Sequence, residues 1–481
     1  MKEERAGCYD HDIVGRITVF YTADLHEGLP QLAKAASVIR AERARLADRR
    51  VPTLYVDAGD SSDPLVPASD LSRGSANFAM LQAAGCDAAT VGEGDAMRWG
   101  PQNVTRLSKE VSLPLMGSNL LDEQGAVWAG LSDPLILERD GLKVGLFGLT
   151  VPYPSVYALF GCWQAEPEQV VAERVGTLRE RGAEVVVCVS HCGLPADIEL
   201  LRKHRGVDLL VSSHTHDTPI VGTVNVGAAL VVHPGAEAEA VGRIDLVRDG
   251  GRWRAENVQL LPPATVADEV VEAEWLRWER RAEELMAEPI GSASDRFPLS
   301  QESPCAVGAL VCAALREWTG ADAAVLFAGH LRDELPAGEI CRRDVWSVVP
   351  GTASPGAAEL DVQELRQMVQ RALDLRHEPA RAIQREHAGY LQSDRLRWEL
   401  DEGTEQITAI YLDGQPLRDD ARRLKIASTD LELGLARRFQ LLDPATAERA
   451  EIDVRAVLRE ALERYLAGHS PAGPPYTGSG R

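Results

Sequence analysis

A chain of 481 residues is too long for one typical hydrophobic core, so two domains are expected. The net charge of -22 argues against sequence-independent nucleic-acid binding, which needs clustered Lys and Arg. Residues 1–5 open no apolar leader and no apolar run is long enough to span a membrane, so we expect a cytoplasmic protein without a membrane partner.

From Arg16 onward, the amino-terminal half alternates short apolar runs with amphipathic segments. The strand-like runs lie at 17–23, 53–58, 88–91, 144–149, 185–190, 209–212 and 230–232. The helical segments between them lie at 32–47, 76–84, 168–180 and 197–204. This alternation predicts a layered α/β domain over residues 15–262.

The second half begins with a connector. Residues 263–289 contain one charged helix, at 266–288, which ends before Pro289. A second α/β domain is expected over 290–466, with helices at 307–318, 362–373 and 445–466 and strands at 323–327 and 406–412. The lead 1–14 and the Pro/Gly/Ser-rich tail 467–481 are expected to be disordered.

Five of the predicted strands in the first domain end in residues that could bind a metal ion. They are followed by Asp24 and His26, by Asp60, by Glu93, by His191, and by His214 and His216. One strand-end Asp or His alone is more often a cap or a loop hydrogen-bonder than a ligand, so the argument depends on the set. Carboxylate oxygen together with imidazole nitrogen suits Mn, Fe, Co or Zn. A carboxylate shared by two ions holds them about 3.5–4 Å apart, and Asp60 is the candidate bridge.

The order of these motifs resembles the calcineurin-like metallophosphoesterase superfamily, in particular its two-domain 5′-nucleotidase (UDP-sugar hydrolase/2′,3′-cyclic phosphodiesterase) branch. The matching stretches are Asp24-Leu25-His26, Gly59-Asp60, Gly92-Glu93-Gly94-Asp95, Ser190-His191 and Ser213-His214-Thr215-His216. The resemblance implies a β-sandwich flanked by helices, followed by an α/β substrate domain. It also implies two divalent metal ions (Mn, Zn, Fe or Co), one bound by Asp24, His26, Asp60 and His216, the other by Asp60, Glu93, His191 and His214. The stretch 114–119 matches as well, which makes Asn119 a candidate substrate-binding residue.

The third motif departs from the family. Glu93 stands where the family has Asn, Gly94 replaces the catalytic His, and Met97 replaces the acid that supports it. Loss of such acid–base help typically costs about 10²–10⁴-fold in rate, or roughly 3–5 kcal/mol. Restoring Asn and His at 93 and 94 is therefore expected to raise turnover of unactivated esters. Asp95 could substitute only if it were protonated; with Asp60, it completes the candidate catalytic pair.

The second domain resembles the substrate-binding domain of the same nucleotidases. Arg332 is kept from the family's Asn-x-Gly-Gly-x-Arg motif, and a guanidinium suits an anionic substrate, while His330 replaces a Gly of that motif. Both are candidate substrate-binding residues; the alternatives are a surface ion pair for Arg332 and a loop histidine for His330. The family's base-stacking loop is replaced by the segment 433–439. We therefore expect a retained fold with altered nucleobase recognition.

Two functions fit these residues. The first is a dinuclear metal-dependent phosphoesterase that acts on a small phosphomonoester or phosphodiester, with a substrate altered from nucleotides. The alternative is a catalytically impaired relative that binds a phosphorylated ligand or a protein partner. The retained ligands favour the first, and the missing His-acid pair and base clamp favour the second.

Overall fold

The computed structural model describes residues 15–159, 161–216, 219–376, 388–401, 403–418, 422–434 and 439–472. The predicted disordered lead lies outside these residues, and so does the predicted tail from 473 onward. The tail prediction is wrong at its start, because Ala467 and Gly468 belong to the helix α15 (Leu458–Gly468). The chain divides into two compact units, Met1–Arg281 and Ala282–Arg481. The division falls inside helix α9 (Glu269–Met286). The predicted domain boundaries at 262 and 290 stay predictions.

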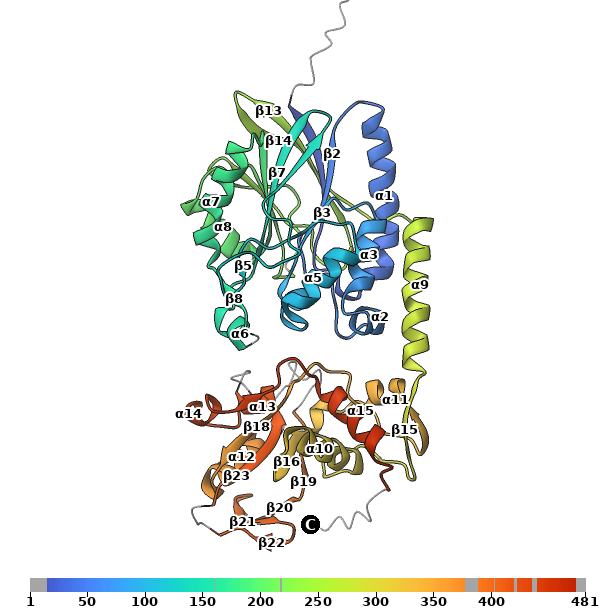
Figure 1. The fold of residues 1–481 in the computed structure, drawn as a ribbon, viewed down its shortest axis with the longest axis vertical. Coiled ribbons are helices and arrows are strands. Elements are labelled where there is room, and N and C mark those ends of the chain that lie inside the picture. Colours follow the sequence, from blue (N-terminus) through green and yellow to red (C-terminus); the bar gives the residue numbers. More distant parts are fainter. Residues whose placement is uncertain are drawn as a thin grey trace, which may run out of the picture. The chain divides into compact units, whose positions relative to one another are not determined.

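The first unit is built on two six-stranded sheets (Figure 1). The first has the order β14-β13-β1-β2-β3-β4 and consists of β1 (Arg16–Thr22), β2 (Thr53–Asp57), β3 (Ala88–Thr90), β4 (Leu115–Met116), β13 (Val241–Asp249) and β14 (Arg252–Leu261). The second has the order β11-β12-β10-β9-β7-β6 and consists of β6 (Leu135–Arg139), β7 (Leu142–Thr150), β9 (Val185–His191), β10 (Leu209–Ser212), β11 (Val224–Val226) and β12 (Ala229–Val232). Strands β1 to β4 are parallel, and so are β7, β9, β10 and β12.

Strand alternation explains why these sheets pack as a sandwich. On β9, Val185, Val187 and Val189 join residues of both sheets in one buried core. Their neighbours Val186 and Cys188 point the other way and pack among residues of two covering helices, α7 (Pro167–Glu180) and α8 (Leu194–Lys203). Strands buried on both faces in this way have nearly continuous apolar sequences. The predicted α/β sandwich is thereby confirmed.

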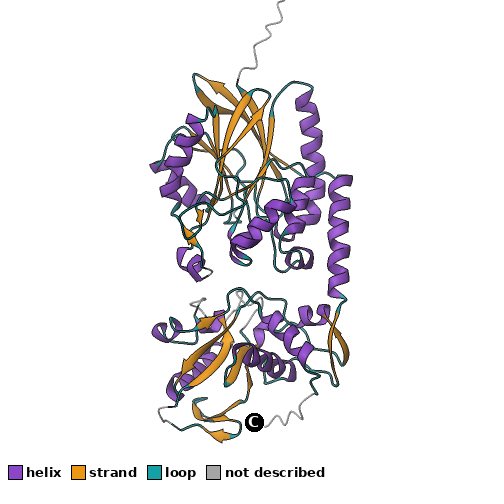
Figure 2. Ribbon diagram, in the orientation of Figure 1, coloured by secondary structure: helices purple, strands orange, loops and turns teal. Residues whose placement is uncertain are grey.

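The remaining elements of this unit surround the sandwich or connect its strands (Figure 2). They are η1 (His26–Gly28), α1 (Leu29–Ala47), α2 (Pro67–Leu71), α3 (Ser75–Ala83), α4 (Glu93–Met97), α5 (Gly100–Glu110), β5 (Leu120–Leu121), α6 (Pro154–Leu159) and β8 (Trp163–Gln164). The hairpin β13–β14 is not among the predicted strands. Its signal is the turn Gly250-Gly251 between segments in which apolar and polar residues alternate, a pattern typical of hairpins.

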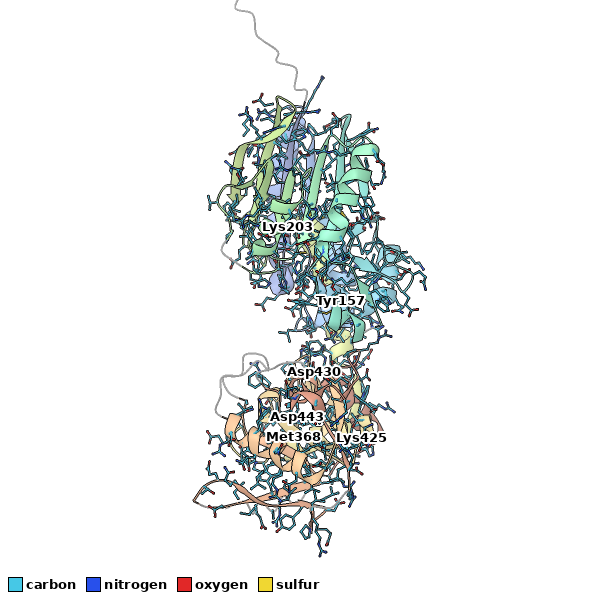
Figure 3. The ribbon with its side chains drawn as sticks, turned by 90° about the vertical axis from the view of Figure 1, so that its left-hand side faces the viewer. Tyr157, Lys203, Met368, Lys425, Asp430 and Asp443 are labelled. Carbon is cyan, nitrogen blue, oxygen red and sulfur yellow. The ribbon has the colours of Figure 1, made fainter. Side chains whose placement is uncertain are left out.

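The second unit has a mixed sheet covered on both faces. Its order is β19-β16-β23-β18-β24, with β16 (Ala323–Phe327), β18 (Pro355–Leu360), β19 (Leu391–Asp394), β23 (Leu424–Thr429) and β24 (Glu451–Ile452). Ala324 and Leu326 of β16 face a core with α10 (Ala306–Thr319) and α15 (Leu458–Gly468). Val325 and Phe327 face the core around α12 (Val362–Leu375), where Figure 3 labels Met368.

The other elements of this unit are short. They are β15 (Pro289–Ala293) paired with β17 (Gly338–Cys341), the three strands β20 (Leu396–Leu400), β21 (Ile407–Leu412) and β22 (Gln415–Pro416), and the helices η2 (Ala328–His330), α11 (Arg342–Val348), α13 (Asp430–Leu433) and α14 (Pro444–Ala447). Among the described residues, no helix is both long and apolar enough to cross a membrane.

The prediction of one helix over 445–466 is wrong. The segment forms α14 and α15, with β24 between them. β24 pairs with the edge of the sheet at β18, and the N–H of Asp453 donates to Pro355 O (2.8 Å). Tertiary pairing of the backbone therefore overrides the local helix propensity that the sequence pattern reports.

Candidate metal centre

The seven predicted ligands converge at the carboxyl ends of parallel strands from both sheets. β1, β2 and β3 of the first sheet lead into the residues Asp24 to Glu93, and β9 and β10 of the second lead into the histidines. The side chains form three overlapping groups, and within each group the candidate ligand atoms lie within 4.8 Å of one another. These groups are Asp24, His26 and His216; Glu93, His191 and His214; and Asp24, Asp60 and His191.

The first group lies at the solvent side of the cluster. Nε2 of His26 is 3.1 Å from Nε2 of His216, which is 3.4 Å from Oδ1 of Asp24. Asp24 is fully buried, whereas the His216 side chain is 47% exposed. Small molecules can therefore reach this group from the His216 side.

The second group is centred on Glu93. Its two carboxylate oxygens lie 2.9 Å from Nε2 of His191 and 2.9 Å from Nδ1 of His214. Burial alone would lower the pKa of His191, but the close contact with the Glu93 carboxylate and the charges of Asp60 and Glu93 raise it to about 10. Without a metal ion, a proton on His191 therefore balances part of the carboxylate charge. Because a ligating imidazole must be neutral, a metal ion bound here would replace that proton.

Asp60 lies between the two groups. Its Oδ2 is 3.5 Å from Nε2 of His26 and 4.0 Å from Nε2 of His191, and its Oδ1 accepts a hydrogen bond from the N–H of Gly94 (2.8 Å). Burial raises the pKa of Asp60 well above its ordinary value, and the charge of Glu93 raises it further. The ionised form of Asp60 therefore needs positive charge nearby, such as a metal ion in each of the two neighbouring groups of ligands.

The backbone at the cluster is held in a conformation that side chains rarely adopt. Positive φ angles between 41° and 80° occur at five of the seven candidate ligands: Asp24, His26, Asp60, His214 and His216. Each such residue typically costs about 1–3 kcal/mol and persists only where the surrounding fold enforces it. Strain concentrated in one cluster is typical of a functional site.

Two glycine loops bring Asp60 against the start of α4. Gly59 has a φ of +94°, and a side chain there would approach the backbone of Gly92 at 3.0 Å. A Cβ on Gly92 would in turn meet the backbone of Asp60, and one on Gly94 would meet its carboxylate. Glycine at these positions is what allows the loops after β2 and β3 to touch.

Among the described residues, three buried atoms of the cluster make no hydrogen bond of normal geometry: Asp24 Oδ1, Glu93 Oε2 and His191 Nε2. The last two face each other at 2.9 Å, a nitrogen and an oxygen that a shared cation or proton would bring together. Nδ1 of His191 lies 2.9 Å from the carbonyl oxygen of Ala58, which can only accept, so a proton on Nδ1 finds a partner there. With the proton on Nδ1, the neutral ring directs a lone pair from Nε2 toward Glu93 and Asp60. Buried polar atoms without partners are rare, and those of this cluster fit the oxygen and nitrogen donors of a transition-metal site.

Comparison with known proteins agrees with this geometry. The family model for the 5′-nucleotidase C-terminal domain matches residues 289–432. The uncharacterized metallophosphoesterase YunD of Bacillus subtilis (strain 168) is 24% identical over 469 residues, covering 94% of this chain and 99% of that protein. Protein UshA of Escherichia coli (strain K12) is 23% identical over 419 residues, covering 73% and 75%.

Solved structures extend the likeness over both units. The NAD nucleotidase NadN of Haemophilus influenzae matches with a TM-score of 0.62 at 12% identity, covering 95% of this chain and 97% of that one. The 5′-nucleotidase precursor of Thermus thermophilus matches with a TM-score of 0.56 at 18% identity, covering 94% and 96%. Over both units, the chain is similar in fold to the two-domain 5′-nucleotidases. The fold of a metallophosphoesterase unit followed by a nucleotidase unit is thus confirmed.

Two further predicted residues of this nucleotidase relative have structural tasks. Asp95 is buried and accepts hydrogen bonds from the N–H groups of Ser62 (2.9 Å) and Gly92 (3.1 Å), so it ties the Asp60 loop to the start of α4. Both ends of the Asn119 amide are engaged, since it donates to Thr150 O (2.7 Å) and accepts from Thr150 N (2.9 Å). A catalytic role for Asp95 and a substrate contact for Asn119 stay predictions.

Several supporting residues do not emerge from the strand-end pattern. Asp57 accepts from Thr22 Oγ1 (2.7 Å) and Ser61 Oγ (3.0 Å), and burial raises its pKa to about 7. Ser213 lies between Nδ1 of His191 and the carbonyl oxygen of Ala58, at 2.8 Å and 2.7 Å. An acid inside an apolar strand, as in Tyr55-Val56-Asp57, is the one sequence signal that could have identified such a residue.

In the second unit, the predicted substrate residues differ in exposure. His330 is buried, and its Nε2 lies 2.9 Å from Oε1 of the fully buried Glu432. The contact between His330 and Glu432 holds η2 against α13. Glu432 also accepts a hydrogen bond from Thr429 Oγ1. Arg332 is exposed, while its backbone N–H donates to Val348 O (2.9 Å). Of the altered loop 433–439, the residues 435–438 lie outside the described part of the chain, and substrate binding by His330 and Arg332 stays a prediction.

Proposed function

We propose that the chain is a dinuclear metal-dependent phosphoesterase that acts on a small phosphomonoester or phosphodiester. The observation that carries this proposal is the convergence of candidate ligand atoms from Asp24, Glu93 and His191, with Asp60 between them, within groups no more than 4.8 Å across. The relatives support a hydrolase of the 5′-nucleotidase class. The number of ions and their identity, two of Mn, Zn, Fe or Co, belong to the proposal.

The ions, Asp60 and Glu93 would have different roles in this reaction. The ions, when bound, would neutralise phosphate charge and supply an activated water as the nucleophile. Asp60, with one oxygen toward His26 and His191, would bridge the two ions. Glu93 adds a negative charge beside His191 and His214, which should tighten cation binding and weaken the cation as a Lewis acid.

The missing imidazole sets the expected range of substrates. Gly94 offers no side chain to assist a leaving oxygen, so esters with poor leaving groups should react slowly. The base-stacking loop of the family is replaced at 433–439, so nucleotides should be poor substrates. We therefore propose a phosphorylated substrate other than a nucleotide.

A panel of esters tests this function. With added Mn, bis(para-nitrophenyl) phosphate and para-nitrophenyl phosphate should be hydrolysed, and 5′-AMP should give a kcat/KM lower by at least about 10²-fold, the typical contribution of the missing assistance. Efficient hydrolysis of 5′-AMP that saturates at low micromolar concentration would refute the altered substrate. No hydrolysis of any ester would favour the alternative, an impaired relative that binds a phosphorylated ligand or a protein partner.

A cytoplasmic location is part of the same proposal. All seven cysteines among the described residues are free thiols, and six of them are buried. Reduced, buried thiols are typical of cytosolic proteins. We propose neither a nucleic-acid partner nor a membrane partner.

A further inference from the structure

A tyrosine lies at the edge of the cluster and belongs to none of the motifs. The hydroxyl of Tyr153 is 3.3 Å from Nε2 of His214, and the two rings meet edge to face with centroids 6.2 Å apart. Tyr153 lies three residues after the end of β7, and its backbone N–H donates to Gln164 Oε1 (2.8 Å). The residue is 38% exposed, so a molecule entering from solvent can touch it.

The two nitrogens of His214 determine what this hydroxyl can do. Nδ1 faces Glu93 at 2.9 Å, and Nε2 faces Tyr153. When Nδ1 offers its lone pair within the cluster, the proton of the neutral ring must be on Nε2, which then donates to the phenol oxygen. Tyr153 keeps its own hydrogen for a second hydrogen bond. A phenol is protonated at neutral pH.

On the side of Glu93 and His214, the chain lacks its family's imidazole. Gly94 has no side chain, and Asp95 is engaged by the backbone of Ser62 and Gly92. Tyr153 is an exposed residue whose hydroxyl contacts His214 of the same group of ligands. Its position therefore suits a donor to an oxygen of a phosphate ester bound there.

We infer that Tyr153 is a catalytic residue that donates a hydrogen bond to the leaving oxygen of the substrate, in place of the missing imidazole. This inference rests on the proposed phosphoesterase function. Water supplies both the hydroxyl that joins phosphorus and the proton that ends on the released alcohol, while the P–O bond to the alcohol breaks. Tyr153 keeps its proton throughout, so no further co-reactant is needed.

Tyr157 provides a matched comparison one helical turn later. Its N–H donates to the carbonyl oxygen of Tyr153 (2.9 Å), so both tyrosines belong to one rigid turn. Tyr157 is fully buried with its ring 6.3 Å from that of Trp128, and among the described residues its hydroxyl has no hydrogen-bond partner. Figure 3 labels it in the first unit. A buried hydroxyl cannot touch a substrate.

The test compares Tyr153→Phe with Tyr157→Phe at saturating Mn. Tyr153→Phe should lower kcat/KM for methyl phosphate at least about 30-fold and for para-nitrophenyl phosphate less than about 3-fold, because an activated leaving group needs less assistance. Tyr157→Phe should leave both values unchanged. Equal losses for both esters in Tyr153→Phe, or an equal loss in Tyr157→Phe, would overturn the inference.

A binding measurement separates this inference from the proposed function. Inorganic phosphate, titrated into Mn-loaded protein, should bind Tyr153→Phe about 10-fold more weakly than wild type, with bound Mn unchanged. If wild type hydrolyses no ester but shows this difference, the phosphoesterase function fails and Tyr153 stands as a phosphate contact. If phosphate binds both proteins equally, binds neither, or if Tyr153→Phe loses Mn, the substrate contact is refuted.

Discussion

Replacing Asp60 by Asn should remove at least one equivalent of bound metal and lower ester hydrolysis by at least about 10³-fold, or roughly 4 kcal/mol. Asn keeps the shape of Asp60 and can still accept from the N–H of Gly94. It lacks the second anionic oxygen, which lies between His26 and His191 and would bridge the two ions. Metal analysis after reconstitution, together with kcat/KM, measures both effects.

Thermal unfolding distinguishes this result from misfolding. Burial and the charge of Glu93 disfavour an ionised Asp60 in metal-free protein, so metal-free Asp60→Asn should melt at or above the temperature of metal-free wild type. Mn should raise the Tm of wild type more than that of the variant, since binding to the native state stabilises it by RT ln(1 + L/Kd), where L is the free Mn concentration, and this term increases as Kd falls. Asp48→Asn, which removes an exposed carboxylate at the end of α1, should behave as wild type. Full metal content in Asp60→Asn would contradict the bridging role.

Gly94→Ala should weaken metal binding and lower hydrolysis about 10-fold or more, although alanine is the better helix former. A Cβ at this position would overlap Oδ1 of Asp60 and lie 3.2 Å from its Cγ. The carboxylate would have to leave the place between the two groups of ligands. Titration of Mn into metal-free protein gives the affinity directly.

The matched control is Gly176→Ala in the helix α7. No atom lies within 4 Å of the Cβ that this change adds, so metal binding should be unchanged and stability should rise by about 0.5–1 kcal/mol. Wild-type Mn affinity in Gly94→Ala would mean that Asp60 can move without consequence. The expectation that histidine at 94 restores activity stays a prediction, and it requires the Asp60 carboxylate to shift, because a Cβ at 94 would overlap Oδ1 of Asp60.

The ligand set could be predicted from sequence because it follows a local rule. Each ligand directly follows a short apolar run, and parallel strands bring their carboxyl ends to one edge. Other contacts depend on the approach of segments far apart in the chain. The overlap of Gly94 with Asp60 joins two loops, and the contact of Tyr153 with His214 joins residues 61 positions apart. Neither contact can be predicted from the pattern of residues within a single segment.

The same distinction applies to the fold. Strand β9 and helix α7 show in their own apolar periodicity, and both lie within a few residues of their predicted ends. The break between α14 and α15 does not show, because it depends on pairing of β24 with β18. Local patterns therefore predicted the layers and the ligand positions, whereas edge pairing and the residues around the ligands required the folded chain.

The most direct test of a dinuclear phosphoesterase is one titration. Mn is added stepwise to metal-free wild type, while bound Mn and the rate of bis(para-nitrophenyl) phosphate hydrolysis are measured in the same samples. We expect hydrolysis to rise with bound Mn and to reach its maximum at two equivalents per chain. A protein that binds no Mn, or that binds two equivalents and hydrolyses nothing, would contradict this function.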